Sequence, residues 1–227
     1  HHDLTKARLR EVLQEDTSFL HYVGHVEPEG MQCADGYLDL ETLSDTGVEA
    51  FLLNGCTSYT QGQALVDAGA FGGVVTLTSV SNTKATKTGR HLAHLLDVGF
   101  DFHGALDVIR RIRISRQNYV VVGDGRVTIS QSDSGTPFLL TCGDRGPDRA
   151  TVTFHEYPTA TFDVGSMTHP YVEDGSTQYL PIGEMATFTV SYDTLEEEFG
   201  DERIPIVVDG ELRWTDSIDL SRIRDRP

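Results

Sequence analysis

Residues 48–78 decide the fold class, because they place a strand, a helix and a second strand in one continuous run, VEAFLLNGCTSYTQGQALVDAGAFGGVVTLT. The segment 48–54 is almost wholly apolar, as expected for a strand that is buried on both faces of a sheet. Thr60 is a candidate N-cap for a helix over 60–68, and a glycine ends that helix before the strand at 72–78. Two buried strands joined by a helix predict a parallel pair with a helical crossover.

The same alternation continues on both sides of this run. The further elements that the apolar periodicity predicts are a helix over 4–15, a strand over Phe19–Val26, helices over 83–98 and from Asp101 onward, and a fourth buried strand over Tyr119–Val122. We therefore predict an α/β domain over residues 1–124, with a mostly parallel sheet that is flanked by helices.

Helical periodicity is absent from Gly125 onward. Segments of period two replace it, at Arg126–Gln131, Ala150–Glu156 and Ala186–Tyr192. Asp209-Gly210 lies between Ile204–Val208 and Glu211–Trp214, which predicts a hairpin with a type I′ turn. Residues 125–227 are therefore expected to form a β-rich accessory domain.

The charge balance excludes some functions. Acidic residues outnumber basic ones by 35 to 18, which gives a formal net charge of -17. A field of this sign repels phosphate, so we expect no direct nucleic-acid binding. No apolar run approaches the roughly 20 residues of a membrane span, so we expect no membrane partner. The acidic composition with little lysine is typical of halophilic proteins from salt-loving archaea, although an acidic protein of ordinary solubility has the same features.

The cysteines indicate a reducing compartment. Cys33, Cys56 and Cys142 are too few and too scattered for a disulfide framework, and the chain has no CxxC pair for zinc. We therefore expect a cytoplasmic protein with no cofactor and no bound metal.

Two motifs place candidate catalytic residues at strand ends. The first is HYVGH at 21–25, in which only His25 lies at the C-terminal end of its predicted strand. The second is NGCTS at 54–58, which follows the strand 48–54. Ligand crevices of open α/β sheets lie outside such strand ends. If the two strands are neighbours, about 4.8 Å apart, His25 and Cys56 emerge into one cleft.

A cysteine and a histidine in one cleft have a defined chemistry. The imidazole of His25 accepts the thiol proton of Cys56, the thiolate attacks a carbonyl carbon, and the imidazolium protonates the leaving amine. The backbone N–H groups of Val26 and Cys56 are candidate oxyanion donors. Three other interpretations stay open: two ordinary core residues, a hydrolase or acyltransferase for another carbonyl substrate, and a zinc site that includes His21 and Cys33.

The order of these motifs resembles the CHAT domain. The resemblance rests on HYVGH, DGYLDLETL, FLLNGCTSY and GQALVDAGAFGGVVTLTSVSN, and it covers about residues 17–124. CHAT domains belong to the caspase-like cysteine peptidases, alongside separase. The resemblance therefore implies a caspase-like fold in which His25 is the base and Cys56 the nucleophile. Two positions depart from the family: Val26 replaces the usual glycine after the histidine, and Gly55 replaces a frequent alanine.

The resemblance also implies partners. CHAT peptidases are coupled to sensor or repeat domains and act in stress, antiviral or cell-death responses, so it implies regulated, limited proteolysis of a protein or peptide substrate. The alternative is a catalytically inactive CHAT module that binds partners. A caspase-like sheet has another strand and helix before the histidine strand, so we expect the chain to be part of a longer protein or one of two polypeptides.

Acidic residues after His25 suggest a substrate pocket. Glu27, Glu29, Asp35 and Asp39 follow the histidine in the sequence, and a pocket that they line is expected to favour an arginine or lysine before the cleaved bond. The alternative is a solvated acidic loop. The β-rich region is expected to govern access to the cleft or to dock a partner.

Overall fold

The computed structural model describes residues 3–27, 29–79, 81–112, 118–132, 135–159 and 183–219, together with residues 167, 169, 172 and 223. The chain divides into two compact units. The first unit contains His1–Leu96, Asp101–Arg110 and Ile114–Ile129, and the second contains Asp97–Phe100, Arg111–Arg113 and Ser130–Pro227.

The first unit is built on a four-stranded sheet with the strand order β1-β5-β6-β7. Its strands are β1 (Thr17–Val23), β5 (Val48–Asn54), β6 (Gly72–Thr76) and β7 (Tyr119–Gly123). β1, β5 and β6 are parallel, which confirms the predicted pairing of the two strands that precede His25 and Cys56. Because consecutive parallel strands are neighbours, their C-terminal ends lie side by side at one edge of the sheet.

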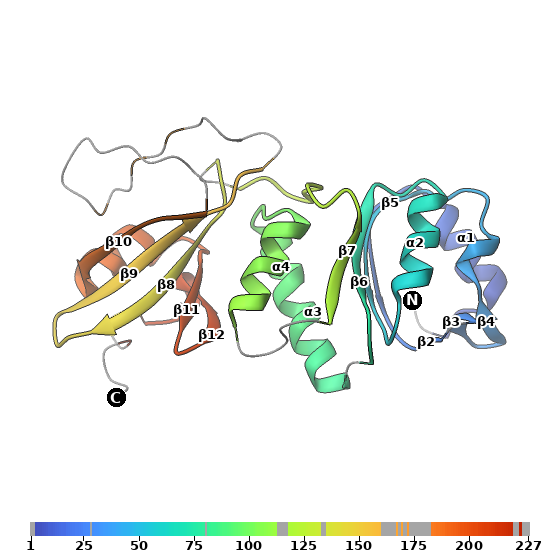
Figure 1. Cartoon of the computed structure of the whole chain (residues 1–227), viewed down its shortest axis with the longest axis horizontal. Coiled ribbons are helices and arrows are strands. Elements are labelled where there is room, and N and C mark those ends of the chain that lie inside the picture. Colours follow the sequence, from blue (N-terminus) through green and yellow to red (C-terminus); the bar gives the residue numbers. More distant parts are fainter. Residues whose placement is uncertain are drawn as a thin grey trace. The chain divides into compact units, whose positions relative to one another are not determined.

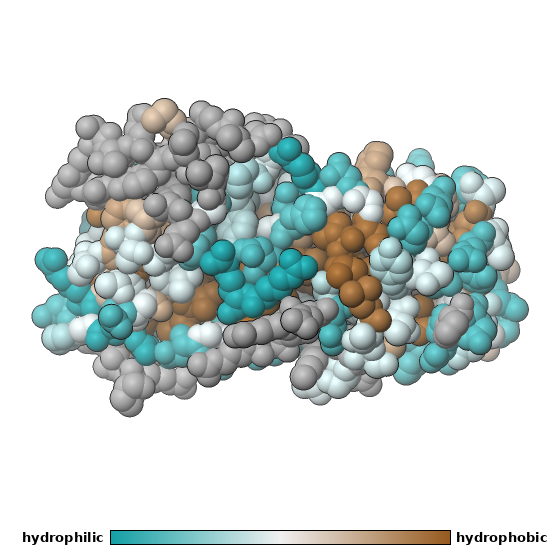
Figure 2. Space-filling model, viewed as in Figure 1, coloured by the Kyte–Doolittle hydropathy of each residue, from teal (hydrophilic) through white to brown (hydrophobic). Residues whose placement is uncertain are grey.

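The fourth strand runs in the opposite direction, so the sheet is mostly rather than wholly parallel. Two helices rather than one connect β6 to β7, and they return the chain to the end of the sheet at which β6 finishes. The backbone N–H of Leu77 accordingly donates to the carbonyl of Asn118 at 2.8 Å. β7 forms an edge of the sheet. Figure 2 shows apolar side chains gathered over β6 and β7. Val120 and Val121 of β7 are only half-buried.

Helices cover both faces of this sheet (Figure 1). α1 (Lys6–Gln14) and α2 (Tyr59–Asp67) lie on one face, and α3 (Asn82–Asp97) and α4 (Phe102–Arg111) lie on the other. α2 approaches the sheet closely, because a Cβ on its Gly62 would lie 2.3 Å from Cγ1 of Val75. The prediction of a mixed α/β architecture with a mostly parallel, helix-flanked sheet is confirmed.

A small antiparallel sheet fills the connection between β1 and β5. Its strands are β2 (Val26–Glu27), β3 (Gly30–Cys33) and β4 (Gly36–Leu38), and the short 3-10 helix η1 (Leu40–Thr42) follows them. The small sheet contributes Val26, Met31, Leu38 and Leu40 to the core that Leu13, Phe51, Leu53, Leu65 and Val75 also form. The segment after His25 is therefore anchored in the core.

The second unit is built on a five-stranded sheet with the order β10-β9-β8-β11-β12. Its elements are β8 (Phe138–Arg145), β9 (Arg149–Glu156), β10 (Gly183–Ser191), α5 (Tyr192–Phe199), β11 (Pro205–Val208), β12 (Glu211–Trp214) and the 3-10 helix η2 (Thr215–Ser217). Among the described strands of this sheet, only β8 and β11 pair in parallel. The predicted hairpin is confirmed, because Asp209 and Gly210 have φ of 55° and 76° and β11 pairs with β12 in antiparallel fashion.

Two predictions for residues 125–227 were wrong. Arg126–Gln131 forms no strand: Asp124 Oδ1 accepts from the Arg126 N–H at 2.9 Å, which starts a turn, and only Thr128 makes an isolated bridge to Asp101. Helical structure also persists, because α5 packs Tyr192, Leu195 and Phe199 against the sheet. The spacing of these three apolar residues is typical of a helix, and a search for alternating apolar and polar residues does not detect it.

Candidate active site

A cavity of about 310 Å³ opens at the C-terminal ends of β1 and β5. Both candidate catalytic residues border it, His25 from the segment after β1 and Cys56 from the turn after β5. The described residues that line it are Val23, Gly24, His25, Asn54, Gly55, Cys56, Ala85 and Thr86. The parallel pairing of β1 with β5, which matches Val23 with Asn54, brings the two segments together.

The backbone of His25 is fixed, whereas its side chain is exposed. Its carbonyl oxygen accepts two hydrogen bonds, from the Gln32 N–H at 3.0 Å and from the Tyr22 hydroxyl at 3.0 Å. Burial raises the pKa of Tyr22 to about 12, so this hydroxyl keeps its proton at neutral pH and remains a donor. The imidazole is therefore presented to the cavity from an anchored segment.

A buried amide supports the turn that carries Cys56. Asn54 is the last residue of β5 and is 3% exposed. Its Nδ2 donates to the Ala85 carbonyl of α3 at 2.8 Å, and its Oδ1 accepts from the Tyr119 hydroxyl of β7 at 2.8 Å. Mainly because of burial, the pKa of Tyr119 is raised to about 12, which keeps that hydroxyl a donor. Sequence reasoning passed over Asn54, although a polar residue that ends an apolar strand is a visible signal.

The two segments around the cavity touch at Gly55. A Cβ at this position would lie 2.8 Å from the Gly24 carbonyl oxygen and 2.6 Å from Cγ2 of Val26. Glycine therefore permits the close approach of the Cys56 turn to the His25 segment. The Val26 side chain is 1% exposed and belongs to the core, so it packs behind the cavity and is not among the described residues that line it.

The four acidic residues of the predicted substrate pocket lie elsewhere. Glu27, Glu29, Asp35 and Asp39 are not among the described residues that line the cavity. Asp35 Oδ1 accepts from the backbone N–H of Lys6 at 2.8 Å. Asp39 Oδ1 caps η1 by accepting from the Glu41 N–H at 3.1 Å, while Glu27 and Glu29 are exposed beside the β2–β3 turn.

The structure also tests the alternative interpretation, in which histidine and cysteine side chains form a zinc site. His21, His25 and Cys33 all border a second cavity, of about 560 Å³, but Cys56 is not among its described lining residues. Within the described part of the chain, no three histidine, cysteine, aspartate or glutamate side chains are close enough to hold a metal ion. The zinc site of His21, His25, Cys33 and Cys56 is therefore not formed by the described residues.

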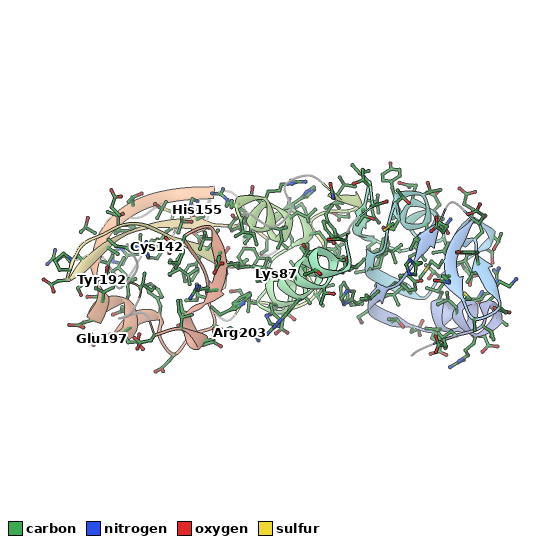
Figure 3. The ribbon with its side chains drawn as sticks, turned by 90° about the horizontal axis from the view of Figure 1, so that it is seen from below. Lys87, Cys142, His155, Tyr192, Glu197 and Arg203 are labelled. Atoms are coloured by element: carbon green, nitrogen blue, oxygen red, sulfur yellow. The ribbon has the colours of Figure 1, made fainter. Side chains whose placement is uncertain are left out.

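The other two cysteines have different surroundings. Burial raises the pKa of the Cys33 thiol, and burial also raises the pKa of the Cys142 thiol in the second unit. Because the thiolate is the reactive form of cysteine, a raised pKa makes both thiols poor nucleophiles at neutral pH. Figure 3 labels Cys142 of β8 and His155 of β9 in the second unit.

No protein-family model matches the chain, and no curated protein is similar to it in sequence. Among the described helices, none combines the length and the apolar character that crossing a membrane requires.

Proposed function

We propose that the chain is the catalytic part of a caspase-like cysteine endopeptidase of the CHAT type. The observation that carries the proposal is the shared cavity at the ends of two parallel strands, which His25 and Cys56 both border. The sheet, with three parallel strands, an antiparallel fourth strand and helices on both faces, is compatible with a caspase-like fold. The order of the motifs around both residues supports the same family.

In the proposed reaction, Cys56 transfers its thiol proton to the imidazole of His25 and attacks the carbonyl carbon of the scissile amide. The tetrahedral oxyanion is stabilised by the backbone N–H of Cys56 and by that of Val26. His25 then donates its proton to the leaving amine, and a thioester remains on Cys56. A water molecule, deprotonated by His25, hydrolyses the thioester and releases the carboxylate product and the thiol.

A peptide panel tests the activity directly. We expect the purified chain to cleave at least one class of peptide, and Cys56→Ala to reduce that turnover by at least about 1,000-fold because the nucleophile is lost. Cys142→Ala is the matched control, and we expect it to keep wild-type turnover. Equal turnover by wild type and Cys56→Ala would reject the peptidase and favour the alternative, a partner-binding module without catalysis.

The lining of the cavity narrows the substrate class. Apart from the imidazole of His25, the described lining consists of small or uncharged side chains and contains no carboxylate. A buried charge without a partner costs several kcal/mol, so an uncharged side chain beside the cleaved bond fits this lining better than arginine or lysine. A peptide panel that varies only the substrate residue before the cleaved bond measures this preference. Strong selection for arginine or lysine would instead favour a substrate pocket that is lined by the acidic residues after His25.

A further inference from the structure

Two buried hydroxyl groups stand behind the turn that carries Cys56. Ser58 ends this turn, and Thr76 ends the neighbouring strand β6. Both residues are 0% exposed, and neither is among the described residues that line the cavity. They are therefore placed to act on Cys56 through the backbone rather than on a substrate.

The two hydroxyls bind four backbone groups between them. Ser58 Oγ donates to the Leu53 carbonyl at 2.8 Å and accepts from the Thr76 N–H at 3.0 Å. Thr76 Oγ1 donates to the Gly55 carbonyl and accepts from the Ser58 N–H at 3.2 Å. A hydroxyl has one proton to donate, so each side chain has used it on a carbonyl of the chain around Cys56. The turn is thus tied to β6 on both sides of the cysteine.

The turn needs such support because of its backbone. Thr57, directly after Cys56, has a φ of 48°, which lies in the left-handed region that β-branched residues rarely adopt. Conformations of this kind persist only where the surroundings fix them. The bonds from Thr76 to Gly55 and to Ser58 enclose Cys56 and Thr57, and Gly55 in turn contacts the Gly24 carbonyl beside His25.

We infer that Thr76 and Ser58 are positioning residues, which hold the thiol of Cys56 in place relative to the imidazole of His25. The inference rests on the proposed peptidase activity, because its effect is on the rate of the reaction. Loss of the Thr76 hydroxyl leaves the Gly55 carbonyl and the Ser58 N–H without their buried partner, so the turn relaxes and the productive geometry is populated less often.

The test compares Thr76→Val with the wild type on the peptide that the panel identifies. We expect kcat to fall at least tenfold while KM changes less than twofold, because substrate contacts are kept and the reacting groups are displaced. Alkylation of Cys56 by iodoacetamide, followed by mass spectrometry, should slow at least threefold. Thr76→Ser retains the hydroxyl and should restore kcat to within threefold of the wild type.

Thr215 in the second unit provides a matched control. It is 1% exposed, and its Oγ1 accepts from the Ile204 N–H at 3.0 Å and donates to the Glu202 carbonyl, as Thr76 does with its own two partners. Thr215→Val therefore removes the same set of bonds far along the chain from Cys56. We expect it to lower the unfolding midpoint, as Thr76→Val does, with no change in kcat.

A second variant covers the case in which Thr76→Val does not fold. Ser58→Ala removes the other hydroxyl without adding volume, and we expect the same fall in kcat. Wild-type kcat and alkylation in folded Thr76→Val or Ser58→Ala would overturn the inference while Cys56→Ala remained inactive. Full turnover by Cys56→Ala would instead reject the peptidase itself.

Discussion

Each unit of the chain has a cysteine and a histidine on, or directly after, neighbouring strands, but the two pairs are placed differently. In the first unit, His25 and Cys56 follow the C-terminal ends of parallel strands and border one cavity. In the second unit, Cys142 lies opposite Val152 and His155 lies opposite Leu139, within antiparallel strands (Figure 3). Leu139 and Cys142 are three positions apart, so the side chains of Cys142 and His155 point to opposite faces of the sheet.

The difference shows that position relative to the strand end, rather than residue type, makes the candidate site. Within a ladder, side chains alternate between faces and the backbone groups are engaged with their neighbours. Beyond the ends of parallel strands, two adjacent segments leave the sheet on the same side and can bring two side chains to one opening. The second pair therefore serves as an internal control for the first.

The largest expected difference in turnover is between a variant that lacks the His25 imidazole and one that lacks the His155 imidazole. His25→Ala should lower turnover of the panel peptide by about 100-fold to 10,000-fold, the range over which a general base contributes. His155 is 3% exposed and contacts Nη1 of Arg111 at 3.3 Å, so His155→Ala should lower stability and leave turnover unchanged. Steady-state kinetics on the folded variants measure both effects, and an equal loss from both would remove the distinction between the two sheets.

Substitution of Gly55 by alanine, compared with the same substitution at Gly146, is expected to give the next largest effect on turnover. Gly55→Ala places a methyl group 2.8 Å from the Gly24 carbonyl oxygen, so the two segments around the cavity must separate. We expect a loss of about 2 kcal/mol in stability and a fall in turnover of at least about tenfold.

Gly146→Ala is the control for this change. Among the described atoms, its Cβ would meet only the Arg149 carbonyl oxygen, at 3.4 Å, which is an ordinary contact. Stability and turnover should both stay near wild type. Wild-type turnover in folded Gly55→Ala would show that the two segments need not touch.

A smaller effect concerns pH and the second unit. Glu156 is 2% exposed, its Oε2 has no hydrogen-bond partner in the described part of the chain, and burial raises its pKa to about 7. A raised carboxyl pKa means that the folded state holds the proton more tightly than the unfolded state. The unit is therefore most stable below about pH 4.5 as far as this group is concerned, and it loses that contribution as the pH rises from about 4.5 to about 7.

Tryptophan fluorescence measures this effect, because Trp214 is the only tryptophan of the chain and lies in β12 of the second unit. The unfolding free energy at pH 8 should be lower than at pH 5 by on the order of 2 kcal/mol from this group. Glu156→Gln should remove that part of the difference. An unchanged pH dependence in the variant would place the titrating group elsewhere.

Much of the first unit follows from local signals. The strand Val48–Asn54 and the helix after Asp101 could be read from apolar periodicity, and Asp101 does cap α4 by accepting from the Gly104 N–H at 2.6 Å. The direction of β7 could also have been predicted, since two successive helices bring the chain back to the end of the sheet at which β6 finishes.

Other features depend on register and could not be read locally. Ser58 and Thr76 are 18 positions apart, and nothing in either segment shows that their hydroxyls meet until β5 and β6 are paired.

The acidic residues after His25 illustrate the opposite error. Their charge suggested a pocket, but Asp35 and Asp39 bind backbone N–H groups near the ends of helical elements. A charge in a loop is often a cap, and only its partners distinguish the two roles.

The most direct test of the central claim is competitive alkylation of the three cysteines in the folded chain at pH 7, read by mass spectrometry, in wild type and in His25→Ala. If His25 and Cys56 work as a pair, Cys56 reacts with iodoacetamide at least tenfold faster than Cys33 and Cys142, and His25→Ala removes most of this advantage. If the three thiols react at similar rates, or if the Cys56 rate is the same with and without the imidazole, the shared cavity does not hold a catalytic pair.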